Sequence, residues 1–159
     1  MNFVLDPISL IMSISAQNEY YQVWQDFLDG KYVLCVTNDI IEEYSEVIAR
    51  NISPLVSEFI ITAILNRKNI KLISPSYAFH LIEADEDDNK FVDCAIIGNA
   101  KYIVTQDHHF NILKQISFPK VDVITLKAFL ADLQKLYTTM RETLDCCLPC
   151  LDVAELASS

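Results

Sequence analysis

The chain has 159 residues, of which 52% are hydrophobic, and its net charge is −10. This length fits one domain that buries a core without disulfides, and the hydrophobic content excludes extensive disorder. No apolar run approaches the roughly 20 residues of a membrane-spanning helix, so no membrane association is expected. The N-terminus lacks a basic region and a cleavage-site pattern, which predicts no signal peptide and a cytoplasmic protein with reduced cysteines.

The net charge bears on possible partners. Nucleic-acid-binding domains usually carry basic patches, whereas this chain has 12 basic and 22 acidic residues. Acids gathered at a metal site would explain part of the excess, because a bound cation offsets their charge locally. The acidity also suits a basic protein partner, or it simply keeps a cytoplasmic protein soluble.

Strand-like and helix-like stretches alternate along the chain. Apolar runs predict strands at about 2–6, 32–36, 70–73, 102–105 and 121–125. Helices are expected near 20–28, for about a dozen residues after 38, from 54 onwards, at about 89–99 and near 108–115. This alternation predicts an α/β fold in which a parallel sheet is covered on both faces. Residues 1–130 form the expected domain, and 131–159 a C-terminal helix or tail of unknown role.

Two helix starts carry recognisable caps. Thr37 or Asn38 caps one helix, and Ser53 caps the next, with Pro54 at its first position. The helix after Pro54 carries apolar side chains at helical spacing: Leu55, Phe59, Ile60, Ala63 and Ile64.

Four carboxylates stand where a small parallel-sheet domain could gather them. Asp6 ends the first expected strand and Asp107 follows the fourth, and ligands bind outside the carboxyl ends of such strands. Glu43 lies one turn into the helix after the second strand, and Asp88 begins a later helix. Acids brought together repel one another unless a cation binds, and Mg²⁺ or Mn²⁺ is the natural occupant. The pattern predicts a metal-dependent nuclease, in which metal-activated water attacks a phosphodiester.

Each acid also has a structural interpretation. Asp6 could end a strand, Asp88 and Asp107 could cap helices, and Glu43 could be a solvated helix residue. The combination of all four at these positions favours the site. The sequence offers no glycine-rich phosphate loop and no serine nucleophile elbow that would indicate another chemistry.

Other polar residues are secondary candidates. Asp93 lies five residues after Asp88, and His108 and His109 directly follow Asp107, where they could contact metal or phosphate. The acids at 85–87 are expected in a solvated loop. Three thiols near the end, with no nearby histidine, make an incomplete zinc site: Cys146, Cys147 and Cys150.

At these residues the sequence resembles the PIN-domain family, in the branch of toxins from toxin–antitoxin pairs. The similarity covers about residues 1–130 and rests on four stretches: Phe3–Asp6, Cys35–Tyr44, Asp85–Ala95 and Ala100–Phe110. The last two together are quite specific, whereas any single one is weak.

The resemblance implies a fold, an activity and partners. The fold is a three-layer α/β/α sandwich with a central parallel sheet. The activity is that of an Mg²⁺- or Mn²⁺-dependent endoribonuclease acting on RNA, with Asp6, Glu43, Asp88 and Asp107 as catalytic, metal-coordinating acids. The expected partners are a cognate antitoxin protein and a second copy of the chain in a homodimer.

One motif departs from the family pattern. The family usually has Asp-Thr-Asn where this chain has Asp6, Pro7 and Ile8. Pro7 lacks a backbone donor and Ile8 cannot hydrogen-bond, and losing a partner of a metal ligand costs about 10–100-fold in affinity or activity. The hydroxyl of Ser9 could compensate. The alternative function is therefore a catalytically impaired PIN domain that binds protein or RNA. A receiver-type phosphoacceptor would need paired acids after the first strand, and only Asp6 stands there.

Overall fold

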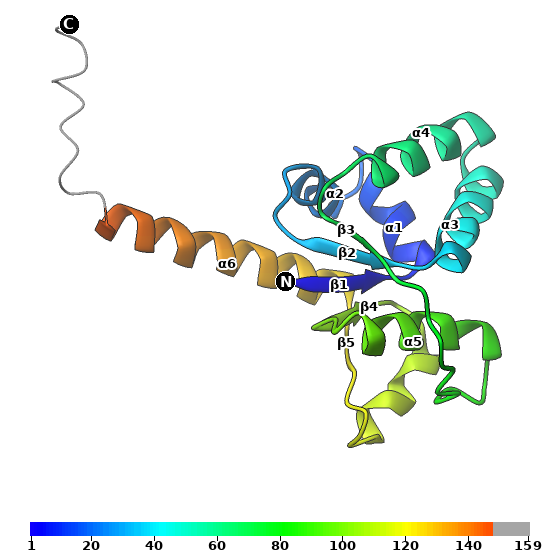
Figure 1. Cartoon of the computed structure of the whole chain (residues 1–159). Coiled ribbons are helices and arrows are strands. Elements are labelled where there is room, and N and C mark those ends of the chain that lie inside the picture. Colours follow the sequence, from blue (N-terminus) through cyan, green and yellow to red (C-terminus); the bar gives the residue numbers. More distant parts are fainter. Residues whose placement is uncertain (148–159) are drawn as a thin grey trace, which may run out of the picture.

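A parallel β-sheet of five strands runs through the computed structural model (Figure 1). The structure describes residues 1–147, with side chains through residue 144. The strands are β1 (Asn2–Leu5), β2 (Val33–Val36), β3 (Ile70–Leu72), β4 (Tyr102–Val104) and β5 (Asp122–Ile124). Their order is β3-β2-β1-β4-β5 and every neighbouring pair is parallel, which confirms the predicted fold class.

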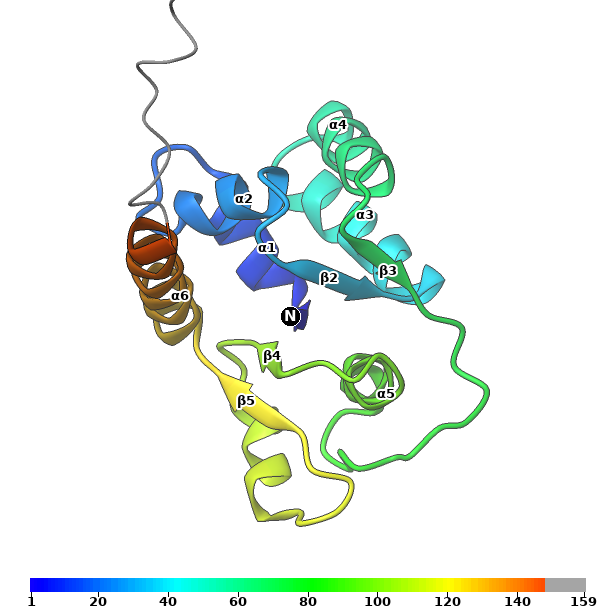
Figure 2. The same ribbon diagram turned by 60° about the vertical axis from the view of Figure 1, so that its left-hand side comes forward.

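Helices cover both faces of this sheet. They are α1 (Pro7–Ile14), α2 (Tyr21–Leu28), α3 (Asn38–Asn51), α4 (Pro54–Leu65), α5 (Asn89–Ile97) and α6 (Leu126–Cys147), with 3₁₀ helices η1 (Glu86–Asp88) and η2 (His108–Gln115). Figure 2 shows α1 to α4 on one side of the sheet and α5 on the other. The three-layer α/β/α arrangement that the resemblance implied is confirmed.

The central strand β1 lies in the middle of the hydrophobic core. Its side chains Phe3, Val4 and Leu5 are all buried. The Phe3 ring lies 5.7 Å from the ring of Tyr32 and 4.7 Å from that of Phe129 on α6, measured between ring centroids. These contacts fix β1 against the start of β2 and against α6, so the residue that follows β1 has a defined position.

Both predicted helix caps are present. The Thr37 hydroxyl accepts a hydrogen bond from the Ile40 backbone N–H (3.2 Å), and the Ser53 hydroxyl accepts one from Val56 (3.1 Å). Each bond satisfies a backbone donor that the first turn of the helix would otherwise leave unpaired.

Helix α1 was not predicted. Its first residue, Pro7, reads as a strand terminator in the sequence, yet proline also suits the first turn of a helix because its missing N–H is not needed there. Asp6 caps this helix by accepting a hydrogen bond from the Ser9 backbone N–H. The Asp6-Pro7 pair is thus a helix-start signal that follows directly on a strand.

Two helices differ from the expected packing. On α4, Ile64 is buried, but Leu55 is 64% exposed and Phe59 is 68% exposed. Helix α6 packs on the core through Leu126, Phe129 and Leu133 and then extends away from the sheet (Figure 1). The boundary expected at residue 130 falls inside this helix, and that division remains a prediction.

The cysteine group expected near the C-terminus lies outside the described side chains. Within residues 1–147, no helix is long and apolar enough to cross a membrane.

Candidate active site

A cleft of about 330 Å³ opens where β1 and β4 end, and all four predicted acids line it. Asp6 directly follows β1, and Asp107 lies three residues beyond the end of β4. Glu43 comes from α3, and Asp88 from the end of η1. The remaining lining is Pro7, Ile8, Val47, Arg50, Asn51, Phe91 and Phe110. The structure thus brings together acids from four distant segments, while their role as metal ligands remains a prediction.

Asp6 is held by donors from two parts of the chain. Its carboxylate accepts a hydrogen bond from the Ser9 backbone N–H (2.6 Å) through Oδ1 and one from the Thr105 hydroxyl (2.5 Å) through Oδ2. Its own backbone N–H donates to the Val104 carbonyl at 3.0 Å. Because Asp6 is only 7% exposed, these bonds fix the carboxylate in one orientation.

Thr105 is a site residue that the sequence interpretation missed. Its side chain is buried, and its hydroxyl oxygen also accepts a hydrogen bond from the Asp107 backbone N–H (3.0 Å). It therefore connects Asp6 with Asp107. The available signal was a polar residue directly after the apolar run Tyr102–Val104, two positions before an acid.

The departure at Pro7 and Ile8 leaves Asp6 with two hydrogen-bond donors. Ile8 is 49% exposed at the cleft, and neither residue supplies a polar side chain. Ser9 contributes its backbone N–H, whereas its buried hydroxyl has no hydrogen-bond partner in the described part of the chain. The support of Asp6 thus comes from a backbone group and from Thr105.

Glu43 is positioned by α3 and paired with a cation. The neighbouring Tyr44 hydroxyl donates to the Leu5 carbonyl (2.5 Å), which ties this turn of α3 to the end of β1. The Glu43 carboxylate forms an ion pair with Lys90 through Oε2. That contact lacks hydrogen-bond geometry, so this buried oxygen has no hydrogen-bond partner among the described residues. Glu43 is therefore held near the cleft by charge rather than by a directed bond.

Asp88 carries a charge that its surroundings disfavour. Its pKa is raised from the usual 3.8 to about 6, mainly by burial and also by the nearby charges of Asp85 and Asp107, while His109 partly opposes the shift. Although Asp88 precedes α5, its side chain makes no capping hydrogen bond to that helix. Its Oδ2 atom is buried without a hydrogen-bond partner in residues 1–144. The interpretation of Asp88 as a simple cap is therefore wrong.

Asp107 is both a cap and a cleft residue. It begins η2 by accepting a hydrogen bond from the His109 backbone N–H (2.9 Å). The His109 ring nitrogen Nδ1 lies 3.5 Å from Asp107 Oδ1 and 3.4 Å from Asp88 Oδ2. The structure thus brings the ring of His109 close to the acids, while the other candidate histidine, His108, is exposed beside it.

Asp93 is placed elsewhere. It is buried and accepts a hydrogen bond from the Phe79 backbone N–H (3.0 Å). It borders a separate pocket lined also by Thr37 and Tyr77. The structure therefore gives Asp93 a bond that secures the loop before η1, away from the four acids.

The acids fit a divalent cation. All four contribute carboxylate oxygens, which are the ligands that Mg²⁺ and Mn²⁺ prefer. Two buried oxygens, Glu43 Oε2 and Asp88 Oδ2, have no hydrogen-bond donor in the described structure. A bound cation would pair with both oxygens, in competition with Lys90 at Glu43, and it would offset the burial and the like charges that raise the pKa of Asp88.

Comparisons with known proteins place this site in a family. No curated protein sequence matches significantly. Among solved structures, VapBC2 from Rickettsia felis, bound to a DNA fragment from their promoter, aligns with a TM-score of 0.56 and 15% identity, covering 79% of this chain and 98% of that one.

Two further solved structures align less closely. The PIN domain endonuclease Utp24 has a TM-score of 0.47 and 10% identity, covering 78% of this chain and 84% of that one. The PIN domain of T. brucei RRP44 has a TM-score of 0.47 and 13% identity, covering 89% and 86%. The sequence profile described as "PIN domain" matches residues 4–109, which is more than half of the chain and includes all four acids of the cleft. The chain therefore belongs to the PIN-domain family.

Proposed function

We propose that this protein is a metal-dependent endoribonuclease that hydrolyses RNA phosphodiester bonds. The observation that carries the proposal is the convergence of Asp6, Glu43, Asp88 and Asp107 on one cleft at the carboxyl edge of the sheet. Membership of the PIN-domain family supports it, because the sequence resemblance assigns metal coordination to the same four acids.

The residues of the cleft would have different roles in this reaction. Asp6, oriented by Ser9 and Thr105, offers a fixed anionic ligand, and Glu43 and Asp88 offer oxygens that lack hydrogen-bond donors among the described residues. Mg²⁺ or Mn²⁺ held by the four acids would supply activation of water and neutralisation of charge at the phosphodiester. Arg50, which also lines the cleft, is placed to attract an RNA phosphate toward the acids.

A second candidate function is a PIN domain that binds protein or RNA without cleaving it. The exposed apolar side chain of Ile8 at the cleft favours this alternative, because it stands where the family has a polar residue. The two donors to Asp6 favour the nuclease, because the support expected from that polar residue is present in another form.

We further propose that the nuclease acts in the cytoplasm as the toxin of a toxin–antitoxin pair and forms a homodimer. The sequence resemblance supports the toxin role, and the net charge of −10 suits a basic antitoxin. Leu55 and Phe59, exposed side by side on α4, offer an apolar surface for a second copy. Light scattering of the purified protein tests the homodimer, and a measured mass equal to that of a single chain would contradict it.

The decisive experiment is Mn²⁺-dependent cleavage of single-stranded RNA by the purified, antitoxin-free protein. Asp88→Asn and Asp107→Asn should abolish cleavage, because each removes one charge from the cleft while keeping the shape of the side chain. Asp122→Asn is the matched control, since Asp122 is an exposed acid on β5 that does not line the cleft.

The possible results separate the candidates. Cleavage by wild type and Asp122→Asn, lost in the two cleft variants, supports the nuclease. Cleavage that survives in Asp88→Asn or Asp107→Asn would contradict the proposed site. A folded wild-type protein that leaves RNA intact would favour the binding domain.

A further inference from the structure

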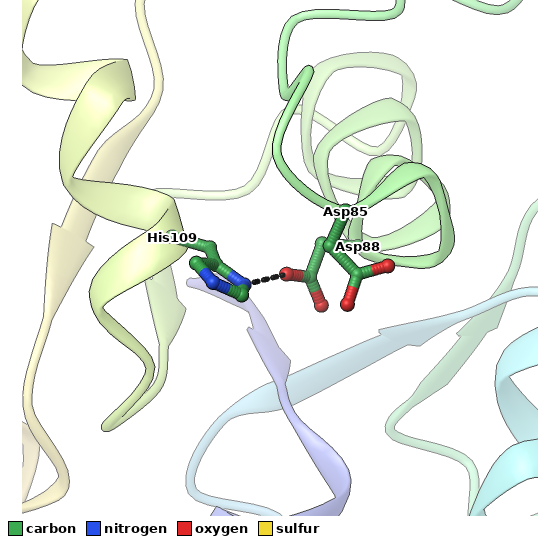
Figure 3. A group of neighbouring side chains, drawn as sticks. All are labelled: Asp85, Asp88 and His109. Atoms are coloured by element: carbon green, nitrogen blue, oxygen red, sulfur yellow. Dashed lines mark ion pairs between the residues drawn. The ribbon is translucent and has the colours of Figure 1, made fainter.

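A second group of possible metal ligands adjoins the cleft. One ligand atom from each of Asp85, Asp88 and His109 lies within 4.8 Å of the other two. Figure 3 shows the three side chains turned toward one another, with Asp85 and Asp88 on the segment before α5 and His109 opposite them on η2. Asp88 belongs to both the cleft and this group, whereas Asp85 and His109 do not line the cleft.

The backbone holds each member in place. Asp85 caps η1 by accepting a hydrogen bond from the Asp87 backbone N–H (3.0 Å), so its carboxylate sits close to that of Asp88 three residues on. The His109 backbone N–H is held by Asp107, which orients the imidazole toward Asp88. Of the acids at 85–87, which were expected in a solvated loop, Glu86 and Asp87 are exposed, whereas Asp85 is only partly exposed.

The atom at the centre of this group lacks a hydrogen bond. Asp88 Oδ2 is buried, faces His109 Nδ1 at 3.4 Å, and has no hydrogen-bond partner within the described side chains. A carboxylate oxygen withdrawn from water without a hydrogen-bond donor destabilises the folded protein. A cation bound among the three side chains would compensate this oxygen directly.

We propose that Asp85, Asp88 and His109 form a mixed carboxylate–imidazole site for a divalent transition-metal ion. Imidazole nitrogen suits transition metals, whereas Mg²⁺ strongly prefers oxygen ligands, so the site binds Mn²⁺ in preference to Mg²⁺. The inference rests on the proposed function in that Asp88 is shared with the cleft. It adds a nitrogen ligand and a metal preference that the four acids alone would not produce.

The test is pulsed electron paramagnetic resonance of the full-length protein loaded with Mn²⁺. This measurement detects nitrogen atoms bound to the metal, and it does not depend on RNA cleavage. The variant is His109→Gln, and the matched control is His108→Gln, which removes the adjacent exposed histidine. Because His109 is 46% exposed, its replacement is not expected to disturb folding, which circular dichroism checks. Asp85→Asn provides a second variant, since asparagine still accepts the capping hydrogen bond.

The site predicts nitrogen modulation in wild type and His108→Gln, and none in His109→Gln. The Mn²⁺ affinity of His109→Gln and of Asp85→Asn should fall about tenfold or more, by analogy with the loss of ligand support. The Mg²⁺ affinity of His109→Gln should change by less than about twofold, because Mg²⁺ gains little from imidazole. Wild type without nitrogen modulation, or modulation that survives in His109→Gln, would overturn the proposal.

The results also separate this inference from the nuclease. Mn²⁺-dependent RNA cleavage without nitrogen modulation would support the nuclease and contradict the mixed carboxylate–imidazole site. Nitrogen modulation in a protein that does not cleave RNA would establish the site and contradict the proposed activity.

Discussion

The two sides of the acidic cleft are built in opposite ways. On the β1 side, both carboxylate oxygens of Asp6 accept hydrogen bonds, from Ser9 and from Thr105. On the η1 side, Asp88 has a pKa raised to about 6 and an oxygen without a hydrogen-bond partner among the described residues. An aspartate on the β1 side thus has hydrogen-bond donors for both carboxylate oxygens, whereas the aspartate on the η1 side does not.

This difference indicates how the cleft divides its roles. Hydrogen bonds to a buried charge fix its position before any ligand arrives, so Asp6 would be a preorganised ligand for the proposed cation. A carboxylate that lacks donors and faces like charges destabilises the folded protein until a cation binds. We therefore expect Asp88 to be the acid at which binding of the proposed cation would most strongly increase protein stability.

Thr105→Val should weaken the satisfied wall and have the largest effect on stability. Valine keeps the shape of the side chain but removes the donor to Asp6 Oδ2 and the acceptor for the Asp107 backbone N–H. We expect the free energy of unfolding, measured in urea, to fall by about 1–3 kcal/mol. The control is Thr138→Val on α6, where the threonine is exposed and the change should stay within about 0.5 kcal/mol. Equal free energies for the two variants would show that the Asp6–Thr105 bond contributes nothing.

Asp88→Asn should relieve the unsatisfied wall and stabilise the metal-free protein. Each pKa unit corresponds to about 1.4 kcal/mol, and solvent screening reduces the expected gain to about 1 kcal/mol. This corresponds to a rise of roughly 2–4 °C in Tm, measured by thermal unfolding with a chelator present.

The stability difference between wild type and Asp88→Asn should depend on pH in one direction. Because the folded-state pKa of Asp88 is raised to about 6, the folded protein binds a proton more tightly than the unfolded chain does. Wild type and Asp88→Asn should therefore be equally stable below about pH 4, and the advantage of the variant should grow up to about pH 6 and then stay constant. An advantage that shrinks as pH rises through this range would contradict the assigned environment.

Ile8→Asn should have the smallest effect, because it adds a polar side chain to the wall that is already satisfied. Asp6 accepts its two hydrogen bonds without help from position 8, and Ile8 is half-exposed. The rate of Mn²⁺-dependent RNA cleavage should stay within about twofold of wild type, well below the 10–100-fold effect of a missing ligand partner. A rise of tenfold or more would show that the departure from the family motif does impair Asp6.

Much of the fold could be predicted because its signals are local. Short apolar runs gave the five strands, and the caps Thr37 and Ser53 gave two helix starts. Asp6 and Asp107 could be assigned to one cleft because parallel strands present their carboxyl ends at the same edge. Helix α1 was missed, since a proline after a strand has two structural meanings, and a helix of 8 residues has too few turns to show its period clearly.

The finer parts of the site depend on contacts between distant segments. The hydrogen bond between Thr105 and Asp6 spans 99 positions, and no sequence feature near Thr105 indicates its partner. The approach of His109 to Asp88 depends on how η2 packs beside η1. Asp93, a buried acid, resembles a site residue in sequence, but its carboxylate accepts a hydrogen bond from the Phe79 backbone N–H. Charge and residue type thus located the cleft, while hydrogen-bond partners required the fold.

The place of β1 between β2 and β4 has a consequence for folding during synthesis. Pairing of β1 with β2 needs only the intervening segment with α1 and α2, whereas pairing with β4 must close a loop of nearly the whole domain, at a larger entropic cost. The two hydrogen-bond donors to Asp6 are therefore made at different stages of synthesis, Ser9 early and Thr105 late. The cleft includes Asp107, so a nascent or truncated chain that ends before this residue lacks one of the four acids of the proposed site.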